Sequence, residues 1–226
     1  MTRKKTLLSW SSGKDSAWTL YQLQQDKNIE LAGLVTTVNQ THQRVAMHAV
    51  RVALLKQQAA AANLPLYIIP IPHPCSNDAY NQAMLSFFES IEGLGVTHMA
   101  FGDLYLDDIR QYRIENLKST GLEPLFPLWL KPTDQLAQEM LAGGLKTRIT
   151  CVDPKQLPAS FAGRDFNQQF LDDLPAGVDP CGENGEFHSF AYAGPMFKHA
   201  INISLGEVVE RDGFVFADLT ETPESL

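Results

Sequence analysis

Cysteine is scarce in this sequence, and long apolar runs are missing. The three cysteines, Cys75, Cys151 and Cys181, are odd in number and far apart, so neither a disulfide framework nor a CxxC metal site is predicted. No run of about 18 apolar residues occurs, which argues against a transmembrane helix. The apolar stretch that follows the basic N-terminus is far too short for a signal peptide. We therefore expect a cytoplasmic protein that does not contact a membrane.

Positive charge is also in short supply. Lysine and arginine number 18 against 26 aspartates and glutamates, and the formal net charge is −8. This balance, without a dense basic patch, does not favour a nucleic-acid partner, because polyanion binding needs local positive charge. Apolar residues make up 44% of the chain, which is typical of a globular protein. The 226 residues suffice for one large domain, or for a medium domain and a small one.

The strongest pattern lies near the N-terminus, where residues 7–18 have the sequence LLSWSSGKDSAW. Its first apolar residues predict the end of a buried strand, Ser11–Ser16 a small polar loop, and residues 17–25 a helix. A loop that leads into a helix N-terminus directs backbone N–H groups at one point, which suits an anion and above all a phosphate. The segment is not a Walker A loop, because Lys14 is followed by Asp15. A serine-rich cap on an ordinary helix is the alternative that the loop alone leaves open.

Strands and helices alternate along the first half of the chain. We expect strands over residues 29–38, 66–71 and 96–101, and helices over residues 49–62, 77–92 and 107–118. This alternation predicts right-handed βαβ units and a doubly wound parallel sheet, an α/β fold of the Rossmann-like type. Ligands of such sheets lie at the carboxyl ends of the strands. Ser11–Ser16, Thr36–Val38 and Gly102-Asp103 all fall at such ends, so we expect a nucleotide site there.

A proline-rich segment over residues 124–132 predicts a crossing between two domains. We expect an α/β domain over residues 1–129, which carries the polar loop, and a smaller α+β substrate domain over residues 130–226. The elements expected in the second domain are helices over 134–141 and 166–174, a strand over 145–152, and a β-hairpin of strands 201–209 and 214–219. Apolar residues at 124–129 could support a homodimer.

A second polar cluster lies in the segment Asp179–Phe190. Glu183 and Glu186 flank Asn184-Gly185, and His188 follows two residues later. Asparagine and glycine favour a tight turn, which could hold both carboxylates near one point. Two carboxylates and an imidazole can bind Mg²⁺, orient an amine or act as a general base. A solvated acidic turn beside a core histidine explains the same residues equally well.

Several motifs together resemble one protein family. Ser11–Ser16 (SSGKDS) resembles the Ser-Gly-Gly-x-Asp-Ser loop of the PP-loop ATP pyrophosphatases, with Ser12 at the first glycine position. The further matching segments are Met47-His48, residues 102–113 (GDLYLDDIRQYR), residues 127–129 (PLW) and residues 179–188 (DPCGENGEFH). Through them the chain, from about residue 5 to residue 219, resembles the diphthine–ammonia ligase family within the adenine-nucleotide α-hydrolase superfamily.

This resemblance implies an enzyme that activates a carboxylate with ATP. ATP would adenylate the substrate carboxyl group and release pyrophosphate, and ammonia or an amine would then displace AMP to leave an amide. The implied nucleotide site comprises Ser11, Ser12, Gly13 and Ser16 around the phosphates, Lys14 at the departing pyrophosphate, Val35, Thr36 and Thr37 at adenine, and Gly102, Asp103 and Arg110 beside them. Asp15 or Asp103 would hold Mg²⁺. The implied catalytic residues are Lys14, Asp15, Glu183, Glu186 and His188, of which the last three would face the acceptor or ammonia.

Some of these residues also have a purely structural explanation. Arg110 and Arg113 could pair on a helix surface with the two aspartates that precede them, but because they lie close to Gly102-Asp103, contact with phosphate or substrate explains them equally well. Cys181 could act as a nucleophile, although a thiol without a CxxC partner is more often a small buried side chain.

One departure from the family bears on the substrate. Diphthamide ligases usually carry Glu-Gly-Gly-Glu-Tyr-Glu-Thr where this chain has ENGEFHS, so His188 replaces an acidic residue. The same reaction on a different, smaller carboxylate therefore stays open. Two other functions are alternatives: an ATP-binding sensor without turnover, and a PP-loop enzyme that thiolates RNA. The last would need paired cysteines and a basic face.

Overall fold

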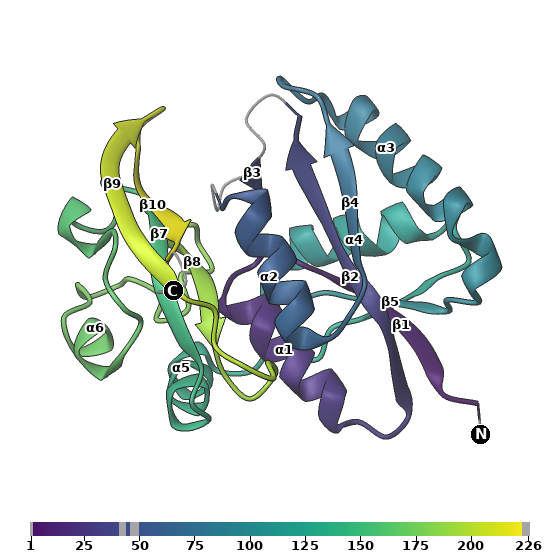
Figure 1. Ribbon diagram of the computed structural model, residues 1–226, viewed down its shortest axis with the longest axis horizontal. Helices are drawn as coiled ribbons and strands as arrows, with labels where there is room; N and C mark the ends of the chain where they lie inside the picture. The colour runs from purple at the N-terminus through teal and green to yellow at the C-terminus, as the bar shows by residue number, and fades with distance from the viewer. Residues whose placement is uncertain (1, 41–43, 46–49, 223–226) are drawn as a thin grey trace.

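The computed structural model of the protein describes residues 2–40, 44–45 and 50–222, so Met47-His48 lies outside the described residues. Figure 1 shows two lobes, a larger one formed by the N-terminal part of the chain and a smaller one formed by the C-terminal part. Each lobe has its own sheet. Helix α1 (Lys14–Gln25) lies where the lobes meet, since it contacts strands of both sheets.

The larger lobe contains a parallel sheet. Its parallel strands are β1 (Lys4–Ser9), β2 (Ile29–Asn39), β4 (Leu66–Ile71), β5 (His98–Ala100) and β6 (Glu123–Leu125), in the order β4-β2-β1-β5-β6. The two-residue strand β3 (Arg44–Val45) pairs antiparallel with the end of β2. The chain runs outward from β1 to β4 and then returns to β5 on the other side of β1. The switch point of the sheet therefore lies between the carboxyl ends of β1 and β5.

Helices cover both faces of this sheet. The helices α1 and α2 (Val52–Ala62) pack on one face, and α3 (Asn77–Ser90) and α4 (Asp107–Leu117) pack on the other. Leu8 of β1 belongs to the core with α1 and α2, whereas its neighbour Leu7 packs with Phe88 of α3 and Leu117 of α4. Successive strand residues point to opposite faces, so a strand covered on both faces must be apolar throughout. The doubly wound α/β fold predicted from the sequence is confirmed.

The smaller lobe contains an antiparallel sheet. Its elements are α5 (Thr133–Ala142), β7 (Lys146–Val152), α6 (Gln168–Asp172), β8 (Phe187–Ala193), β9 (Ile203–Arg211) and β10 (Phe214–Glu221), and the strand order is β8-β7-β10-β9. The hairpin predicted for the C-terminal segment is confirmed, because β9 and β10 pair antiparallel. Short 3₁₀ turns occur at Glu92–Leu94 and Ala159–Phe161.

Three strands were not predicted from the sequence: β3, in the polar segment after β2, and the two strands β6 and β8. β6 lies in the proline-rich segment that we interpreted as a crossing between domains, and it includes Pro124. Proline is tolerated there because β6 is the last strand at its edge of the sheet. β8 begins at Phe187, directly after the acidic turn. The C-terminal end of the turn is therefore anchored to a buried strand.

The two lobes share a hydrophobic core. One continuous cluster of buried side chains contains Trp18 and Leu20 of α1, Met140 of α5, and Phe187 and Phe190 of β8. The domain boundary predicted at residues 129–130 falls between β6 and α5, and it stays a prediction, as does the homodimer.

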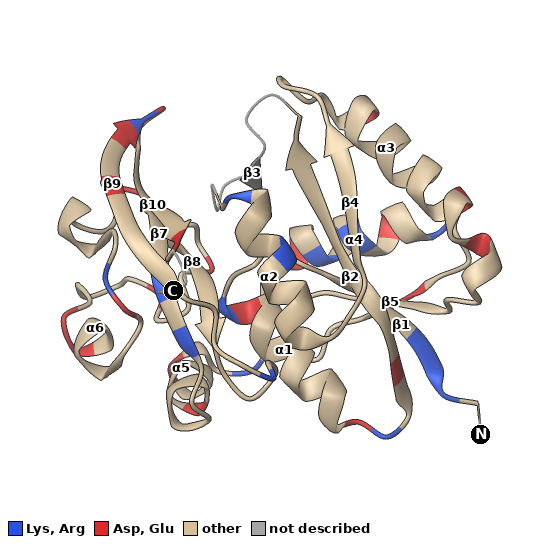
Figure 2. Cartoon of the chain, in the orientation of Figure 1, with Lys and Arg blue, Asp and Glu red and all other residues tan. Residues whose placement is uncertain are grey.

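The charged residues of the described chain do not gather by sign. Figure 2 shows Lys and Arg interspersed with Asp and Glu over both lobes. None of the helices described is long and apolar enough to span a bilayer.

Candidate active site

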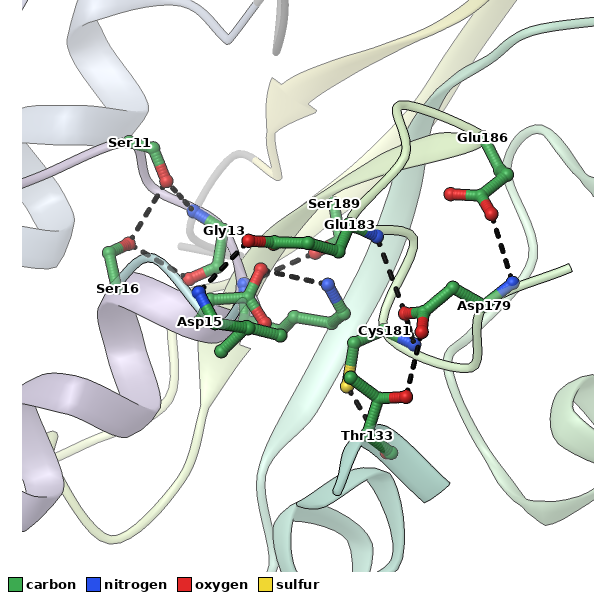
Figure 3. A network of polar contacts seen from close by, with 12 residues as sticks. Ser11, Gly13, Asp15, Ser16, Thr133, Asp179, Cys181, Glu183, Glu186 and Ser189 are labelled. Carbon is green, nitrogen blue, oxygen red and sulfur yellow. Dashed lines mark hydrogen bonds and ion pairs between the residues drawn. The ribbon is translucent and has the colours of Figure 1, made fainter. Parts of the chain in front are cut away.

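The polar loop between β1 and α1 is braced by its own hydroxyl groups (Figure 3). Ser11 Oγ donates a hydrogen bond to Ser16 Oγ at 3.2 Å, and Ser16 Oγ donates to the Gly13 carbonyl oxygen at 3.0 Å. The Gly13 N–H donates to Ser11 Oγ at 3.4 Å. Because α1 begins at Lys14, the N–H groups of its first turn, which have no partner within the helix, lie at the carboxyl end of β1. This geometry supports the predicted anion site.

Gln58 of α2 holds the loop in place. Its fully buried carboxamide accepts a hydrogen bond from the Trp10 indole N–H at 2.8 Å and donates to the carbonyl oxygens of Ser12 at 2.9 Å and Ala191 at 2.7 Å. The Ala191 N–H in turn donates to the Ser12 carbonyl oxygen at 2.9 Å. The loop is therefore fixed both by α2 of its own lobe and by β8 of the other lobe. Ser12 has a left-handed φ of 75°, which favours glycine.

Lys14, which is buried, and Asp15, which is half-buried, form an ion pair at the start of α1. Lys14 Nζ lies 2.8 Å from Asp15 Oδ2 and 5.2 Å from the centre of the Phe187 ring. Burial lowers the pKa of Lys14, but the Asp15 carboxylate and other acidic groups nearby outweigh it, so the pKa is raised overall. Burial also raises the pKa of Asp15, an effect that Lys14 partly offsets. Lys14 therefore stays protonated and can offer a positive charge to a phosphate group.

The acidic turn is built on Asp179 and Glu186 (Figure 3). Asp179 Oδ1 accepts a hydrogen bond from the Cys181 N–H at 2.8 Å, and its Oδ2 accepts one from the Thr133 hydroxyl at 2.7 Å. Glu186 is 2% exposed and accepts hydrogen bonds from the N–H groups of Asp179 and Asn184, each at 2.9 Å. Glu186 thus points into the turn, whereas the sequence led us to expect it to face the acceptor.

Glu183 is the carboxylate of this turn that meets the other lobe. Its Oε1 accepts a hydrogen bond from the Leu104 N–H, just after β5, at 2.9 Å. Burial raises the pKa of Glu183 to about 7; the Leu104 hydrogen bond and Lys14 oppose the rise, and Asp15 adds to it. A carboxyl group with a pKa near neutrality can accept or donate a proton at physiological pH.

Two neighbouring cavities lie at the carboxyl ends of the parallel strands. The first, of about 300 Å³, is mainly apolar and is lined by Val35, Thr36, Thr37, Tyr80, Met84, Phe88, Met99, Asn116 and Leu117, among others. The second, of about 270 Å³, is polar and is lined by Lys14, Asp15, Ser16, Gly102, Asp103, Glu183, Gly185 and Ser189, among others. The residues that line both are Ser9, Ser11, Phe101, Arg113 and His188, so the cavities share a wall. The polar loop and the acidic turn, which are far apart in the sequence, border the same space.

Most residues predicted for the site line these cavities. They are Ser11, Lys14, Asp15, Ser16, Val35, Thr36, Thr37, Gly102, Asp103, Glu183 and His188. Ser12 and Gly13 are buried within the loop, and Glu186 points into the acidic turn. Arg110 lies outside both cavities and stacks on Trp129, with Cζ 4.9 Å from the centre of the ring.

Gln58 is a candidate that the sequence does not single out, and Arg113 is one for which the sequence leaves a surface ion pair and a phosphate contact equally open. Arg113 lines both cavities, and its Nε lies 3.5 Å from Asp103 Oδ2. Arg110, Arg113 and Leu117 recur at helical spacing, so the pattern could place both arginines on one face of α4 without telling which reaches the cavity. Gln58 is one of two adjacent glutamines in an ordinary helix, and no local signal marks it.

Asp15 and Asp103 are the residues that could hold Mg²⁺. Both line the second cavity, and Asp15 Oδ1 is buried without a hydrogen bond to any residue that the structure describes. Mg²⁺ is usually bound by one or two carboxylates together with substrate phosphates and water. Two carboxylates therefore fit a magnesium ion that arrives with a nucleotide. In the described part of the chain, no three His, Cys, Asp or Glu side chains form a cluster that could hold a metal by itself.

The buried thiols are poorly suited to covalent chemistry. Burial raises the pKa of Cys151 to about 12 and also raises the pKa of Cys181. Both thiols therefore stay protonated at neutral pH, whereas nucleophilic attack and sulfur transfer need a thiolate. The Cys181 thiol instead donates a weak hydrogen bond to the Thr133 carbonyl oxygen at 3.4 Å.

Two protein-family models match this chain. The diphthamide synthase N-terminal domain matches residues 4–123, and the diphthamide synthase C-terminal domain matches residues 132–218. The chain belongs to the diphthamide synthase family. The resemblance inferred from the motifs is thus confirmed at the level of the family.

Similar proteins of known name agree with this membership in the diphthamide synthase family. Proteins named diphthine–ammonia ligase from Bos taurus and Homo sapiens are each 28% identical to this chain, over 92% of its length and 85% of theirs. A diphthine–ammonia ligase from Rattus norvegicus is 32% identical over 57% of this chain and 48% of the relative.

Proposed function

We propose that the protein is an ATP-dependent ligase that adenylates a carboxylate and then transfers ammonia or an amine to form an amide. The observation that carries this proposal is that the polar loop and the acidic turn border one cavity. The loop offers a cation and N–H groups suited to phosphate, and the turn offers a carboxyl group suited to proton transfer. The names of the relatives, which pair diphthine with ammonia, support the same reaction class.

The two cavities divide ATP between them. The first suits adenine, because its walls are mainly apolar and the Val35–Thr37 segment at the end of β2 can present backbone groups to the edge of the ring. The second suits the β- and γ-phosphates, because Ser11, Lys14 and Ser16 lie along it at the start of α1. ATP would then cross the shared wall with its α-phosphate between the two cavities.

In the first step, a carboxylate oxygen of the acceptor attacks the α-phosphorus, and the bond to the β-phosphate breaks to release pyrophosphate. The Lys14 ammonium group and the N–H groups at the start of α1 would stabilise the negative charge of the leaving pyrophosphate. A magnesium ion held by Asp15 and Asp103 would neutralise part of the remaining phosphate charge.

In the second step, the nitrogen of ammonia attacks the acyl carbon, and the bond to AMP breaks to leave the amide. The attacking nitrogen must lose a proton, and Glu183 could accept it, because Glu183 lines the second cavity and has a pKa of about 7. His188 lines both cavities and would lie beside the acceptor. It is therefore the residue at which acceptor choice could differ from that of relatives with an acid in its place.

The test is to identify the products that purified protein forms from Mg²⁺-ATP and ammonium. Diphthine, a set of small carboxylates and no acceptor would be compared in parallel. AMP and pyrophosphate that appear only with an acceptor would support the proposal and identify the acceptor. ADP and phosphate would overturn it, and ATP recovered intact with every acceptor would favour a sensor without turnover.

A pair of lysine variants links the products to the site. Lys14→Gln should abolish pyrophosphate release, because it removes the buried cation beside the polar loop. Lys118→Gln is the matched control, because Lys118 forms an exposed ion pair with Glu115 at the end of α4. Thermal melting of both variants shows whether lost activity reflects lost fold. An active Lys14→Gln protein would contradict the role given to Lys14.

A further inference from the structure

Arg113 of α4 stands at the boundary between the two cavities. Its side chain is 28% exposed and lines both of them. The other residues that they share are Ser9, Ser11, Phe101 and His188. Among these five, Arg113 is the residue that carries a guanidinium group. A guanidinium group is positively charged and presents several N–H donors in a planar fork, which suits a phosphate oxygen.

Two neighbours fix the position of this guanidinium. Arg113 Cζ lies 5.3 Å from the centre of the Phe101 ring, and Arg113 Nε lies 3.5 Å from Asp103 Oδ2. Tyr80 of α3 is also close: burial raises the pKa of Tyr80, and the positive charge of Arg113 opposes that rise. A guanidinium stacked on a ring and paired through Nε still has N–H groups to donate to an oxyanion.

Arg113 lies where the α-phosphate of ATP would be if the two cavities divide the nucleotide as proposed. If adenine occupies the first cavity and the β- and γ-phosphates occupy the second, the α-phosphate must cross the wall between them. We propose that Arg113 is a catalytic residue that contacts a non-bridging oxygen of the α-phosphate and stabilises the charge that develops there during adenylation. This inference rests on the proposed function and adds to it the residue that acts at the reacting phosphorus. Charge stabilisation at a reacting centre is commonly a large contribution to catalysis.

Arg110 provides a matched control on the same helix. It lies three residues before Arg113, and its guanidinium stacks on Phe126 and Trp129, with Cζ 5.3 Å and 4.9 Å from the ring centres. It lines neither cavity. The same Arg→Gln substitution at the two positions therefore removes one positive charge from the same helix. At Arg113 the charge is lost beside the proposed position of the α-phosphate, and at Arg110 it is lost away from that position.

The first test compares the binding of AMP and adenosine by titration calorimetry, in the presence of EDTA. The two ligands differ only in the α-phosphate, and EDTA removes any effect that depends on a metal held by Asp103. Arg113→Gln should weaken AMP binding by about 10- to 100-fold, as expected for a lost hydrogen bond to a charged group. Adenosine binding should stay within about twofold, and Arg110→Gln should leave both affinities within the same range.

Each other outcome overturns the inference. Unchanged AMP binding in Arg113→Gln would show that the guanidinium does not contact the α-phosphate. An equal loss of AMP and adenosine binding would show that Arg113 only supports the walls of the first cavity. Wild-type protein that binds AMP no better than adenosine would show that no α-phosphate site exists. Arg113→Lys, which keeps the charge, should recover part of the AMP affinity, and this recovery separates lost charge from lost fold.

Turnover gives a second, stereochemical test. The two diastereomers of ATP with sulfur in place of one non-bridging α-oxygen should differ in their rates of pyrophosphate release by wild-type protein, because one of them disturbs the Arg113 contact. Arg113→Gln should reduce that difference, and Arg110→Gln should preserve it. If wild-type protein releases no pyrophosphate at all, the proposed function fails, while the AMP and adenosine comparison still decides whether Arg113 contacts the phosphate.

Discussion

At the scale of single residues, the buried environment of the Glu183 carboxyl group should make amide formation depend on pH. Its pKa of about 7 means that the carboxylate needed to accept a proton is populated only as the pH rises through neutrality. Glu183→Gln keeps an oxygen that can accept the Leu104 N–H bond, but it cannot accept a proton. We expect amide formation to fall by about 10²- to 10⁴-fold, with a smaller effect on pyrophosphate release.

The ratio of wild-type to Glu183→Gln rates isolates this side chain. The ionisation of free ammonium affects both proteins equally, so the ratio should rise with pH and level off above about pH 7. Rates of amide formation measured from pH 5.5 to 8.5 provide the check. A ratio that does not change with pH would show that Glu183 does not act as the base.

The same carboxyl group should make the folded protein less stable as the pH rises. The pKa of Glu183 is raised in the folded state, so the folded state binds more protons than the unfolded state between pH 4.5 and about pH 7. Stability therefore falls across this window and then stays lowered. Relative to wild type, Glu183→Gln should raise the free energy of unfolding by about 1–2 kcal/mol at pH 8, after allowance for partial exposure, and by little at pH 4.5. Urea unfolding at both pH values would measure the difference, and equal differences would contradict the pKa assignment.

Ser12 has a backbone conformation that should lower the stability of the folded protein. Its φ of 75° is left-handed, its side chain is fully buried, and its hydroxyl makes no hydrogen bond within the described chain. A side chain in that region costs about 1–2 kcal/mol, whereas glycine costs about 0.5–1 kcal/mol in unfolded-chain entropy. Ser12→Gly should therefore stabilise the protein by up to about 1 kcal/mol, or about 2–4 °C in melting temperature.

Ser11→Gly is the matched control for this prediction. The Ser11 hydroxyl donates to Ser16 Oγ and accepts from the Gly13 N–H, so its removal should destabilise the protein. Differential scanning calorimetry compares both variants with wild type. Lower stability of Ser12→Gly would show that the Ser12 side chain contributes packing that outweighs its backbone strain.

At the scale of elements, α2 positions the polar loop of the active site through the side chain of Gln58. Gln58→Met would fill a similar volume, but it would remove three hydrogen bonds and leave the Trp10 N–H and the Ala191 carbonyl oxygen without this buried partner. We expect a loss of about 2–4 kcal/mol in stability. Because the Ser12 carbonyl would lose one of its two restraints, ATP turnover should also fall, by about 10- to 100-fold in kcat/KM.

Gln57→Met controls for the change of amide to thioether on the same helix, because Gln57 is the adjacent, less buried residue. It should leave stability within about 0.5 kcal/mol of wild type. Chemical unfolding and steady-state kinetics on both variants decide the matter. If Gln58→Met lost stability but kept kcat/KM, Gln58 would support the core alone and would not position the loop.

Element patterns in the sequence predicted the sheet of the larger lobe well, because long apolar strands alternate with helices there. The failures have local causes. β6 is three residues long and contains Pro124, so it lacks both the length and the composition of a typical strand. In the site, spacing could bring Glu183 and Glu186 to one turn, but their opposite orientations depend on Asp179 and Leu104. Likewise, the choice between Arg110 and Arg113 depends on Trp129, which packs against Arg110 only in the tertiary fold.

At the scale of the whole molecule, the site exists because the two lobes are joined. Lys14 N–H donates to Ser189 Oγ at 3.2 Å, and Leu104 N–H donates to Glu183 Oε1 at 2.9 Å. Two hydrogen bonds thus cross between the lobes, and each involves a residue that lines the polar cavity. The core is continuous across the same junction, with Trp18 of α1 and Met140 of α5 in one cluster. We therefore expect both sheets to unfold in a single transition.

Gly143, at the end of α5, is the residue at which this junction can be disturbed with one methyl group. Its φ of −76° suits any residue, so glycine is not required by the backbone. A Cβ atom at Gly143 would, however, lie 2.3 Å from Trp18 Cη2, and Trp18 is 3% exposed and cannot turn outward without leaving the core. Gly143→Ala should therefore cost about 1–3 kcal/mol, the usual penalty for overpacking.

Gly93→Ala is the control, because a Cβ atom at Gly93 would meet no other atom within 4 Å. Thermal melting would be followed by far-UV circular dichroism, which reports both sheets, and by tryptophan fluorescence, which includes Trp18 at the junction. Because the lobes share one core, both signals should move together to a lower temperature in Gly143→Ala and stay near the wild-type value in Gly93→Ala. Two separate transitions, with only one of them shifted, would show instead that the lobes are independent folding units. The polar cavity between them would then depend on docking of the lobes as well as on their folding.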